Sequence, residues 1–164
     1  MRKLAFLAPL GLVLALASTP VVAQTPQVTV TIGGNLRNEV ETLGEREVQE
    51  QADRLAQVVS RTLDRSDALG GARIELVLIE LRPNRPTFQQ MADRPGLDGF
   101  HSVSIGGATI EGQITTASGE VIPVRYDWHT NNISEVTGFT TWQDADRAYA
   151  RLASNLVAGR YVTR

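Results

Sequence analysis

The run RIELVLIEL at residues 73–81 constrains the fold of this chain more than any other stretch. Its apolar side chains alternate between the two faces of a strand, with one set comprising Ile74, Leu76 and Leu78 and the other Val77 and Ile79. A strand that is apolar on both faces is typical of the interior of a sheet, where both faces are covered. The sequence therefore predicts a central strand at 73–81, with neighbours on both sides.

Two segments carry the period of an amphipathic helix. The first covers about 20 residues after Thr42, where apolar residues recur at steps of three and four. They are Val48, Ala52, Leu55, Val59 and Leu63. The second helix is expected to have the stripe Trp142, Ala145, Tyr149, Leu152 and Leu156. Thr42 with Glu45, and Thr141 with Asp144, have the spacing of helix N-terminal caps. Because each helix has a single apolar stripe, each is expected to cover only one surface.

Two similar segments, TVTIGG at 29–34 and SVSIGG at 102–107, both end in a glycine pair. Around the second pair, the apolar residues stand at odd positions before the glycines and at even positions after them. A β-bulge adds one residue and restores the facing, and glycine adopts the backbone that this needs. We therefore expect a strand at 101–116 that is bulged at Gly106 and Gly107. A phosphate-binding loop is not favoured, because no lysine follows the glycines and no helix opens after them. An internal repeat is not favoured either, because the similarity stops at the glycines.

Two more strands are predicted, at 27–32 and 121–129, where polar and apolar residues alternate. Pro123 cannot donate a hydrogen bond to a neighbouring strand, which favours either an edge position for the second of them or a backbone nitrogen that faces outward at this residue. The predicted order is β-α-β-β-β-α. The economical packing is an α+β two-layer sandwich, in which a mostly antiparallel four-stranded sheet carries both helices on one face. A single domain is expected to span 24–164.

The first 23 residues have the features of a cleaved export signal. Two basic residues follow the initiating methionine, an apolar run fills 4–17, and Val21 and Ala23 suit the cleavage positions. The run is shorter than the roughly 20 apolar residues that a spanning helix needs. We expect cleavage after Ala23, with Ala17 as the alternative, and a periplasmic or secreted protein without stable membrane insertion. The chain contains no cysteine, which excludes disulfides and thiol chemistry.

The charge of the chain argues against nucleic acid as a partner. Without Arg2 and Lys3, 14 basic residues stand against 18 acidic ones, a net charge of −4. Nucleic-acid binding needs a basic face. The order helix, three strands, helix over 42–158 resembles that of double-stranded-RNA-binding domains. That resemblance implies basic residues at the start of the last helix, but Asp144 and Asp146 stand there and would repel phosphates.

Residues 82–100 form a long irregular loop, because their prolines and glycines exclude continuous secondary structure. One turn of helix is expected at 87–92 with Thr87 as its cap, and Phe88 and Met91 are expected to anchor the loop to the core. Long loops in compact domains are often functional. This one carries three arginines: Arg82, Arg85 and Arg94.

The guanidinium groups of these arginines are suited to hold a carboxylate, a sugar phosphate or an acidic strip of a partner. The alternative is a solvated loop whose arginines pair with acidic residues of the first predicted helix. We interpret the loop as the better candidate for a binding site in this chain.

A second candidate lies on the outward face of the 121–129 strand. Asp127 and His129 are two residues apart, as metal ligands can be, and Arg125 shares their face. His101 would join them if the start of the preceding strand lies beside the end of this one. The alternative is an ordinary polar outer face, and no metal or other cofactor is expected. No G-x-S-x-G motif supports a hydrolase.

In its length, its signal and its topology, the chain resembles the small exported α+β domains that accompany the envelope of Gram-negative bacteria. The resemblance implies a non-catalytic interaction or envelope-accessory domain with an envelope protein as its partner. Two alternatives stay open. One is a small-molecule- or metal-binding protein, or a hydrolase, that uses the exposed sheet face. The other is oligomer assembly through pairing of an edge strand.

Overall fold

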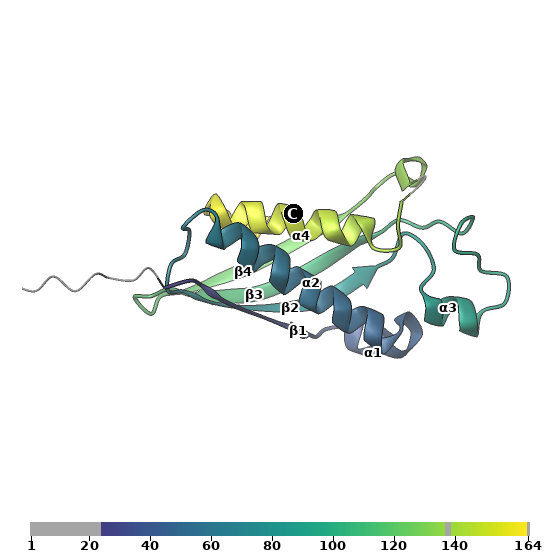
Figure 1. Cartoon of the computed structure of the whole chain (residues 1–164), viewed down its shortest axis with the longest axis horizontal. Coiled ribbons are helices and arrows are strands. Elements are labelled where there is room, and N and C mark those ends of the chain that lie inside the picture. The colour runs from purple at the N-terminus through teal and green to yellow at the C-terminus, as the bar shows by residue number, and fades with distance from the viewer. Residues whose placement is uncertain (1–23, 137–138, 164) are drawn as a thin grey trace, which may run out of the picture.

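The chain folds into one mixed β-sheet with its two long helices packed on the same face (Figure 1). The computed structural model describes residues 24–136 and 139–163, and the expected signal segment at 1–23 lies outside them. The elements are β1 (Gln27–Ile32), α1 (Leu36–Leu43), α2 (Glu45–Asp64), β2 (Arg73–Arg82), α3 (Phe88–Asp93), β3 (Gly107–Thr115), β4 (Val121–His129), η1 (Ile133–Val136), α4 (Gln143–Val157) and β5 (Val162–Thr163). The predicted α+β class is confirmed.

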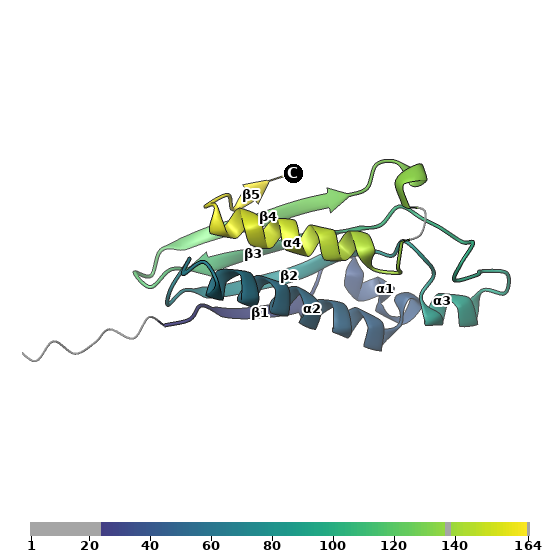
Figure 2. The same cartoon turned by 45° about the horizontal axis from the view of Figure 1, so that its top comes forward.

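The sheet has the strand order β1-β2-β3-β4-β5. β2, β3 and β4 are antiparallel to one another, whereas β1 runs parallel to β2 and β5 runs parallel to β4. The described part of the chain therefore has five strands rather than the predicted four, and its sheet is mixed. The prediction that 73–81 forms a central strand is confirmed, since β2 pairs with β1 and β3. Figure 2 shows the short β5 beside β4.

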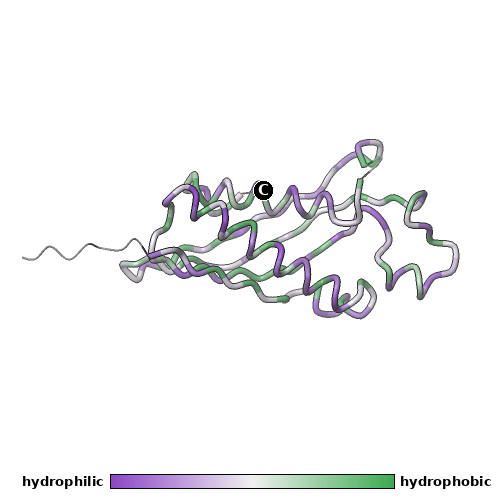
Figure 3. The backbone as a smooth tube through the Cα atoms, in the orientation of Figure 1, coloured by the Kyte–Doolittle hydropathy of each residue, from purple (hydrophilic) through white to green (hydrophobic). Residues whose placement is uncertain are grey.

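The long helices bury the stripes that the sequence predicts. In α2, the five predicted stripe residues are all buried. In α4, four of the five are buried and Trp142 is half-buried. α2 packs against α4 and β1, and α4 packs against β3 and β4. Figure 3 shows apolar and polar residues alternating along both helices, as a single buried stripe requires. None of the helices in these described ranges has the length and apolarity to cross a membrane.

Both predicted helix caps are wrong. Thr42 lies inside α1, a short helix that the sequence analysis missed, and α2 begins after Gly44, which has φ 95°. α4 begins after Trp142, and no side chain caps it. The backbone carbonyl of Thr141 instead accepts a hydrogen bond from the backbone N–H of Asn84 at 2.7 Å. The capping patterns therefore predicted the start of each helix to within a few residues, but they did not identify the capping residue.

The predicted bulge is also misplaced. β3 begins only at Gly107, so the segment 101–106 lies outside the sheet. The register shift occurs in β2, between Leu78 and Glu80. The buried face of β2 accordingly changes from Ile74, Leu76 and Leu78 to Leu81. The change of parity before Gly106 has a different cause: Val103 and Ile105 line a surface cavity instead of the core.

The two glycine pairs lie at the same end of the sheet, because β1 is parallel and β3 antiparallel to β2. A Cβ on Gly34 would lie 2.8 Å from the Cβ of Ile79, and one on Gly106 would lie 2.6 Å from the Asn84 amide. Gly107 has φ 153°, and its Cβ would collide with the backbone of Trp128 and His129. Close approach of the backbone therefore explains both pairs.

Tyr149 is fully buried, and its hydroxyl finds no hydrogen-bond partner among the described residues. Burial raises the pKa of this hydroxyl far above its ordinary value. A buried polar group without a partner costs free energy, so Tyr149→Phe should increase the free energy of unfolding by about 1 kcal/mol. Urea denaturation measures this, and Tyr161→Phe, at a half-buried tyrosine, is the control with little expected change.

The same tyrosine predicts a loss of stability at high pH. Above about pH 10 the tyrosine of the unfolded chain ionises while the buried one stays protonated. The unfolded state then binds fewer protons than the folded state, so stability falls as pH rises beyond this point. Tyr149→Phe should make this alkaline loss smaller, as measured by the melting temperature between pH 8 and pH 11. An identical alkaline loss in both proteins would contradict the assignment.

Candidate functional site

The residues between β2 and β3 form an extension beyond one end of the sheet, which contains α3 (Figure 1). The predicted helical turn is confirmed. Thr87 and Gln90 form a complete capping box, in which the Thr87 hydroxyl accepts from the Gln90 backbone and the Gln90 side chain accepts from the Thr87 backbone. We call this extension, residues 83–106, the loop end.

Asn84 and Asp144 join the loop end to the start of α4, and neither side chain is exposed. The Asn84 side-chain amide donates to the Asp144 carboxylate at 2.6 Å, and its carbonyl accepts from the Asp144 backbone N–H at 2.9 Å. The Asn84 backbone carbonyl also accepts from the N–H of Ser104. Arg147 supplies the second contact of the Asp144 carboxylate, at 3.2 Å. This buried pair fixes the base of the loop end on the domain.

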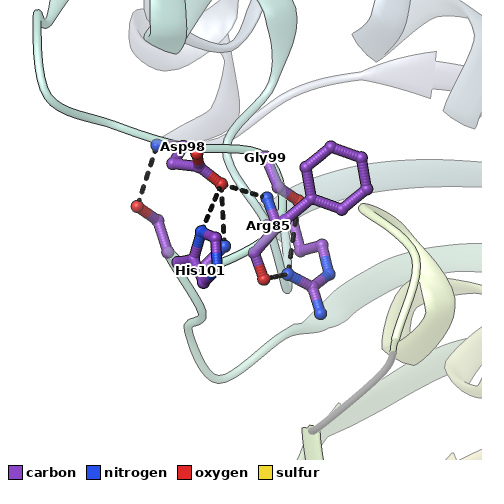
Figure 4. A network of polar contacts seen from close by, with 6 residues as sticks. Arg85, Asp98, Gly99 and His101 are labelled. Atoms are coloured by element: carbon purple, nitrogen blue, oxygen red, sulfur yellow. Dashed lines mark hydrogen bonds and ion pairs between the residues drawn. The ribbon is translucent and has the colours of Figure 1, made fainter.

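Arg85 closes the loop end from the other side. Its guanidinium donates to the backbone carbonyl of Gly99 at 3.2 Å, and also to those of Phe100 and Phe139. Figure 4 shows the Arg85 side chain beside Gly99, next to the turn at Asp98. The Arg85 side chain therefore joins backbone segments of the loop end and Phe139 through its Nε and Nη1 atoms.

Asp98 organises the turn that follows. Its carboxylate accepts from the backbone N–H groups of Phe100 at 2.6 Å and His101 at 2.9 Å, and from the His101 ring at 3.1 Å (Figure 4). The two backbone hydrogen bonds lower the pKa of the Asp98 carboxyl below its ordinary value, with the His101 ring as a smaller cause. His101 itself is exposed and belongs to this turn, so it does not reach the end of β4 as the metal hypothesis required.

Two cavities lie at the loop end. The arginine cavity has a volume of about 310 Å³. Its lining includes Arg82, Arg94, Gln90, Ser102 and the apolar residues Leu97, Val103 and Ile105. The phenylalanine cavity has a volume of about 460 Å³, and Phe88, Met91, Leu97, Phe100, Glu47 and Asp98 contribute to its lining. The two cavities share Pro86 and Leu97 as part of their walls.

The three predicted loop arginines thus have different surroundings. Arg82 and Arg94 line the same cavity, whereas Arg85 is tied to backbone carbonyls. Arg82 forms an ion pair with Glu80 at 2.5 Å, and no residue in the described ranges pairs with the guanidinium of Arg94. The alternative prediction, that these arginines pair with acidic residues of α2, is therefore not seen in the described residues.

Phe88 and Phe100 are exposed aromatic side chains, with relative exposures of 73% and 84%. The expectation that Phe88 anchors the loop to the core is wrong. Glu47 of α2 takes that role instead, because its carboxylate accepts from the backbone N–H of Phe88 at 2.9 Å and from the indole of Trp142 at 3.3 Å. Both phenylalanines border the phenylalanine cavity.

The outward face of the sheet carries cross-strand polar pairs. Arg125 forms an ion pair with Glu111 at 3.2 Å. Asp127 contacts the His129 ring at 3.1 Å and accepts a hydrogen bond from the Thr109 hydroxyl at 3.2 Å. Asp127 and His129 are therefore brought together as expected. Within the described residues, no group of three or more histidine, cysteine or acidic side chains could hold a metal ion.

Several residues of the loop end escaped the sequence analysis. Asn84 and Asp144 are 60 residues apart, and no periodic pattern links two polar residues across such a distance. In the sequence, Phe100 is the last residue of the irregular segment 82–100. Its position among prolines and glycines, outside any apolar stripe, is the signal that could have marked it as exposed.

The sequence was compared with models of known protein families and with curated proteins. Neither comparison finds a match.

Proposed function

We propose that the chain is an exported, non-catalytic domain that binds a partner protein of the cell envelope through its loop end. The export part rests on the N-terminal sequence, where basic residues, an apolar run and small residues follow one another. The binding part rests on the geometry of the loop end.

The observation that carries the proposal is the exposure of Phe88 and Phe100 at the border of one cavity. Aromatic residues dominate the energetics of protein interfaces, because they remove much apolar surface from water at a small cost in conformational entropy. The two phenylalanines can project into a partner protein, and the phenylalanine cavity beside them can accept a side chain of that partner.

Hydrogen bonds hold the backbone next to both phenylalanines in place. Arg85 and Asp98 fix the backbone on either side of Phe100, and Glu47 together with the capping box at Thr87 fixes the start of α3. A surface that is already ordered loses less conformational entropy on binding.

Replacing Phe88 or Phe100 with serine should abolish capture of the partner. Each change removes exposed apolar surface, so folding should be unaffected while affinity falls by roughly 2 kcal/mol or more, about thirtyfold. The experiment is affinity capture from envelope extracts followed by titration of the captured protein. Val121→Ser, at an exposed valine (58%) in β4, is the matched control.

The outcome against the proposal is equally clear. If Phe88→Ser, Phe100→Ser and Val121→Ser all retain the same captured protein with the same affinity, the loop end is not the binding surface.

A further inference from the structure

The arginine cavity is lined by polar and cationic residues, and none of the described residues that line it is acidic, although Glu80 beside it pairs with Arg82. The neighbouring phenylalanine cavity differs in this respect, because Glu47 and Asp98 contribute to its lining. Two arginines line the arginine cavity, Arg82 from the end of β2 and Arg94 from the residue after α3. Its local charge is therefore opposite to the net charge of the chain, −2.

Much of this donor capacity is unused. A guanidinium carries five N–H donors. Arg82 contacts Glu80 through one nitrogen, and Arg94 has no partner among the described residues. The Gln90 side chain uses its carbonyl in the capping box, which leaves its amide N–H groups to donate. Ser102 accepts a hydrogen bond from the N–H of Asp98 through its hydroxyl oxygen, so its own proton is also available.

The walls of the arginine cavity are held in place by bonds that do not involve these donors. Ser104 is joined to Asn84 by a backbone hydrogen bond of 2.9 Å and to the carbonyl of Pro83 through its hydroxyl at 2.5 Å. On the opposite side, the capping box fixes α3. The donors are thus presented on an ordered frame, which lowers the entropic cost of binding.

The remaining lining is apolar and the space is small. Leu97, Val103 and Ile105 form apolar wall beside the two arginines. A volume of about 310 Å³ corresponds to about ten water molecules and lies at the lower limit of the range for ligand pockets. The space suits a ligand of few heavy atoms with one charged end.

We infer that the arginine cavity binds small organic anions, in which a carboxylate or phosphate group meets Arg82 and Arg94 and a short apolar body packs against Leu97, Val103 and Ile105. Guanidinium groups form strong, charge-assisted hydrogen bonds with both kinds of oxyanion. Phe88 and Phe100 do not line this cavity, although it shares Pro86 and Leu97 with the phenylalanine cavity, and binding of an anion does not require that the chain bind a protein.

The test is a titration of the full chain at low salt, followed by calorimetry and by ¹H–¹⁵N NMR. The probes are hexanoate, hexyl phosphate, inorganic phosphate and the neutral hexanamide. We expect one or both organic anions to bind with a Kd below about 1 mM, and the neutral amide to bind at least about tenfold more weakly. The NMR signals that shift should be those of Gln90 and of residues 102–105. Hexanoate and hexyl phosphate distinguish a carboxylate ligand from a phosphate ligand.

Arg94→Gln is the decisive variant, because this side chain has no described partner whose loss would disturb the fold. It should weaken binding of the organic anion at least about tenfold, the loss expected for one charge-assisted hydrogen bond. Arg61→Gln, on the exposed surface of α2, makes the same change in net charge and should leave the Kd unchanged.

Three results would overturn the inference. The first is no binding of either organic anion at about 10 mM, far above the expected Kd. The second is an equal effect of Arg94→Gln and Arg61→Gln. The third is that hexanamide or inorganic phosphate binds as tightly as the organic anions. Equal binding of hexanamide would show that the charge of the ligand does not contribute to affinity, and equal binding of inorganic phosphate would show that its apolar body does not.

Discussion

Asn84→Asp should destabilise the folded protein by about 3–5 kcal/mol at pH 7, a large part of the stability of a domain of this size. The substitution hardly changes the shape of the side chain. It removes the N–H donor that lies 2.6 Å from the buried Asp144 carboxylate and puts a second carboxylate in its place. Two facing carboxylates without solvent repel each other strongly. Urea denaturation at pH 7 measures the loss.

The control for Asn84→Asp is Asn38→Asp, which makes the same chemical change on the exposed surface of α1 and should alter stability by no more than about 0.5 kcal/mol. Equal stability of Asn84→Asp and Asn38→Asp at pH 7 would show that the buried pair does not hold the loop end.

Gly107→Ala should cost about 4 kcal/mol of folding free energy. Gly107 has φ 153°, where a side chain strains the backbone by about 1–3 kcal/mol. A Cβ at this position would also collide with the Trp128 carbonyl and the His129 backbone across the β3–β4 ladder, and overpacking of this kind costs about 1–3 kcal/mol more. The β3–β4 pairing at this end of the sheet is expected to separate.

Gly119→Ala separates the two causes. Gly119 also has a positive φ, 87°, but nothing lies within 4 Å of the position of its Cβ. Its substitution should therefore show only the conformational cost, about 1 kcal/mol. Thermal and urea denaturation of both variants provide the comparison. If Gly107→Ala loses no more folding free energy than Gly119→Ala, the close approach of the β4 backbone is not the reason for glycine at position 107.

The elements that bury a periodic apolar stripe could be predicted from the sequence. α2, α4, β2 and β4 follow the period of their apolar residues, because burial of these side chains is the main favourable term in folding. The short helix α1 could not be predicted in this way, since it buries only Leu36 and Leu43, seven residues apart. The misplaced bulge has a similar origin. Val103 and Ile105 follow the alternation of a strand, but they line a surface cavity and do not belong to a strand.

The candidate site shows where reasoning from residue types ends. Arg82, Arg85 and Arg94 are equivalent by residue type, and the segment predicted at 82–100 differs in its bounds from the 83–106 that lie between β2 and β3. Only the three-dimensional arrangement separates Arg85, whose guanidinium reaches the carbonyl of Gly99, from the two that line the arginine cavity. Hydrogen-bond partners are determined by distances and directions in space. For residues as far apart in the sequence as Arg85 and Gly99, the spacing along the chain does not give these distances.

The position of β1 has a consequence for the order in which the molecule assembles. β1 has one neighbour, β2, and its first residue pairs with Arg73, beyond both α1 and α2. The antiparallel strands β3 and β4 are joined by the few residues 116–120, so their loop-closure entropy is much smaller. Pairing of β1 with β2 closes a much longer segment of chain, so we expect β1 to join the sheet after the antiparallel strands have paired.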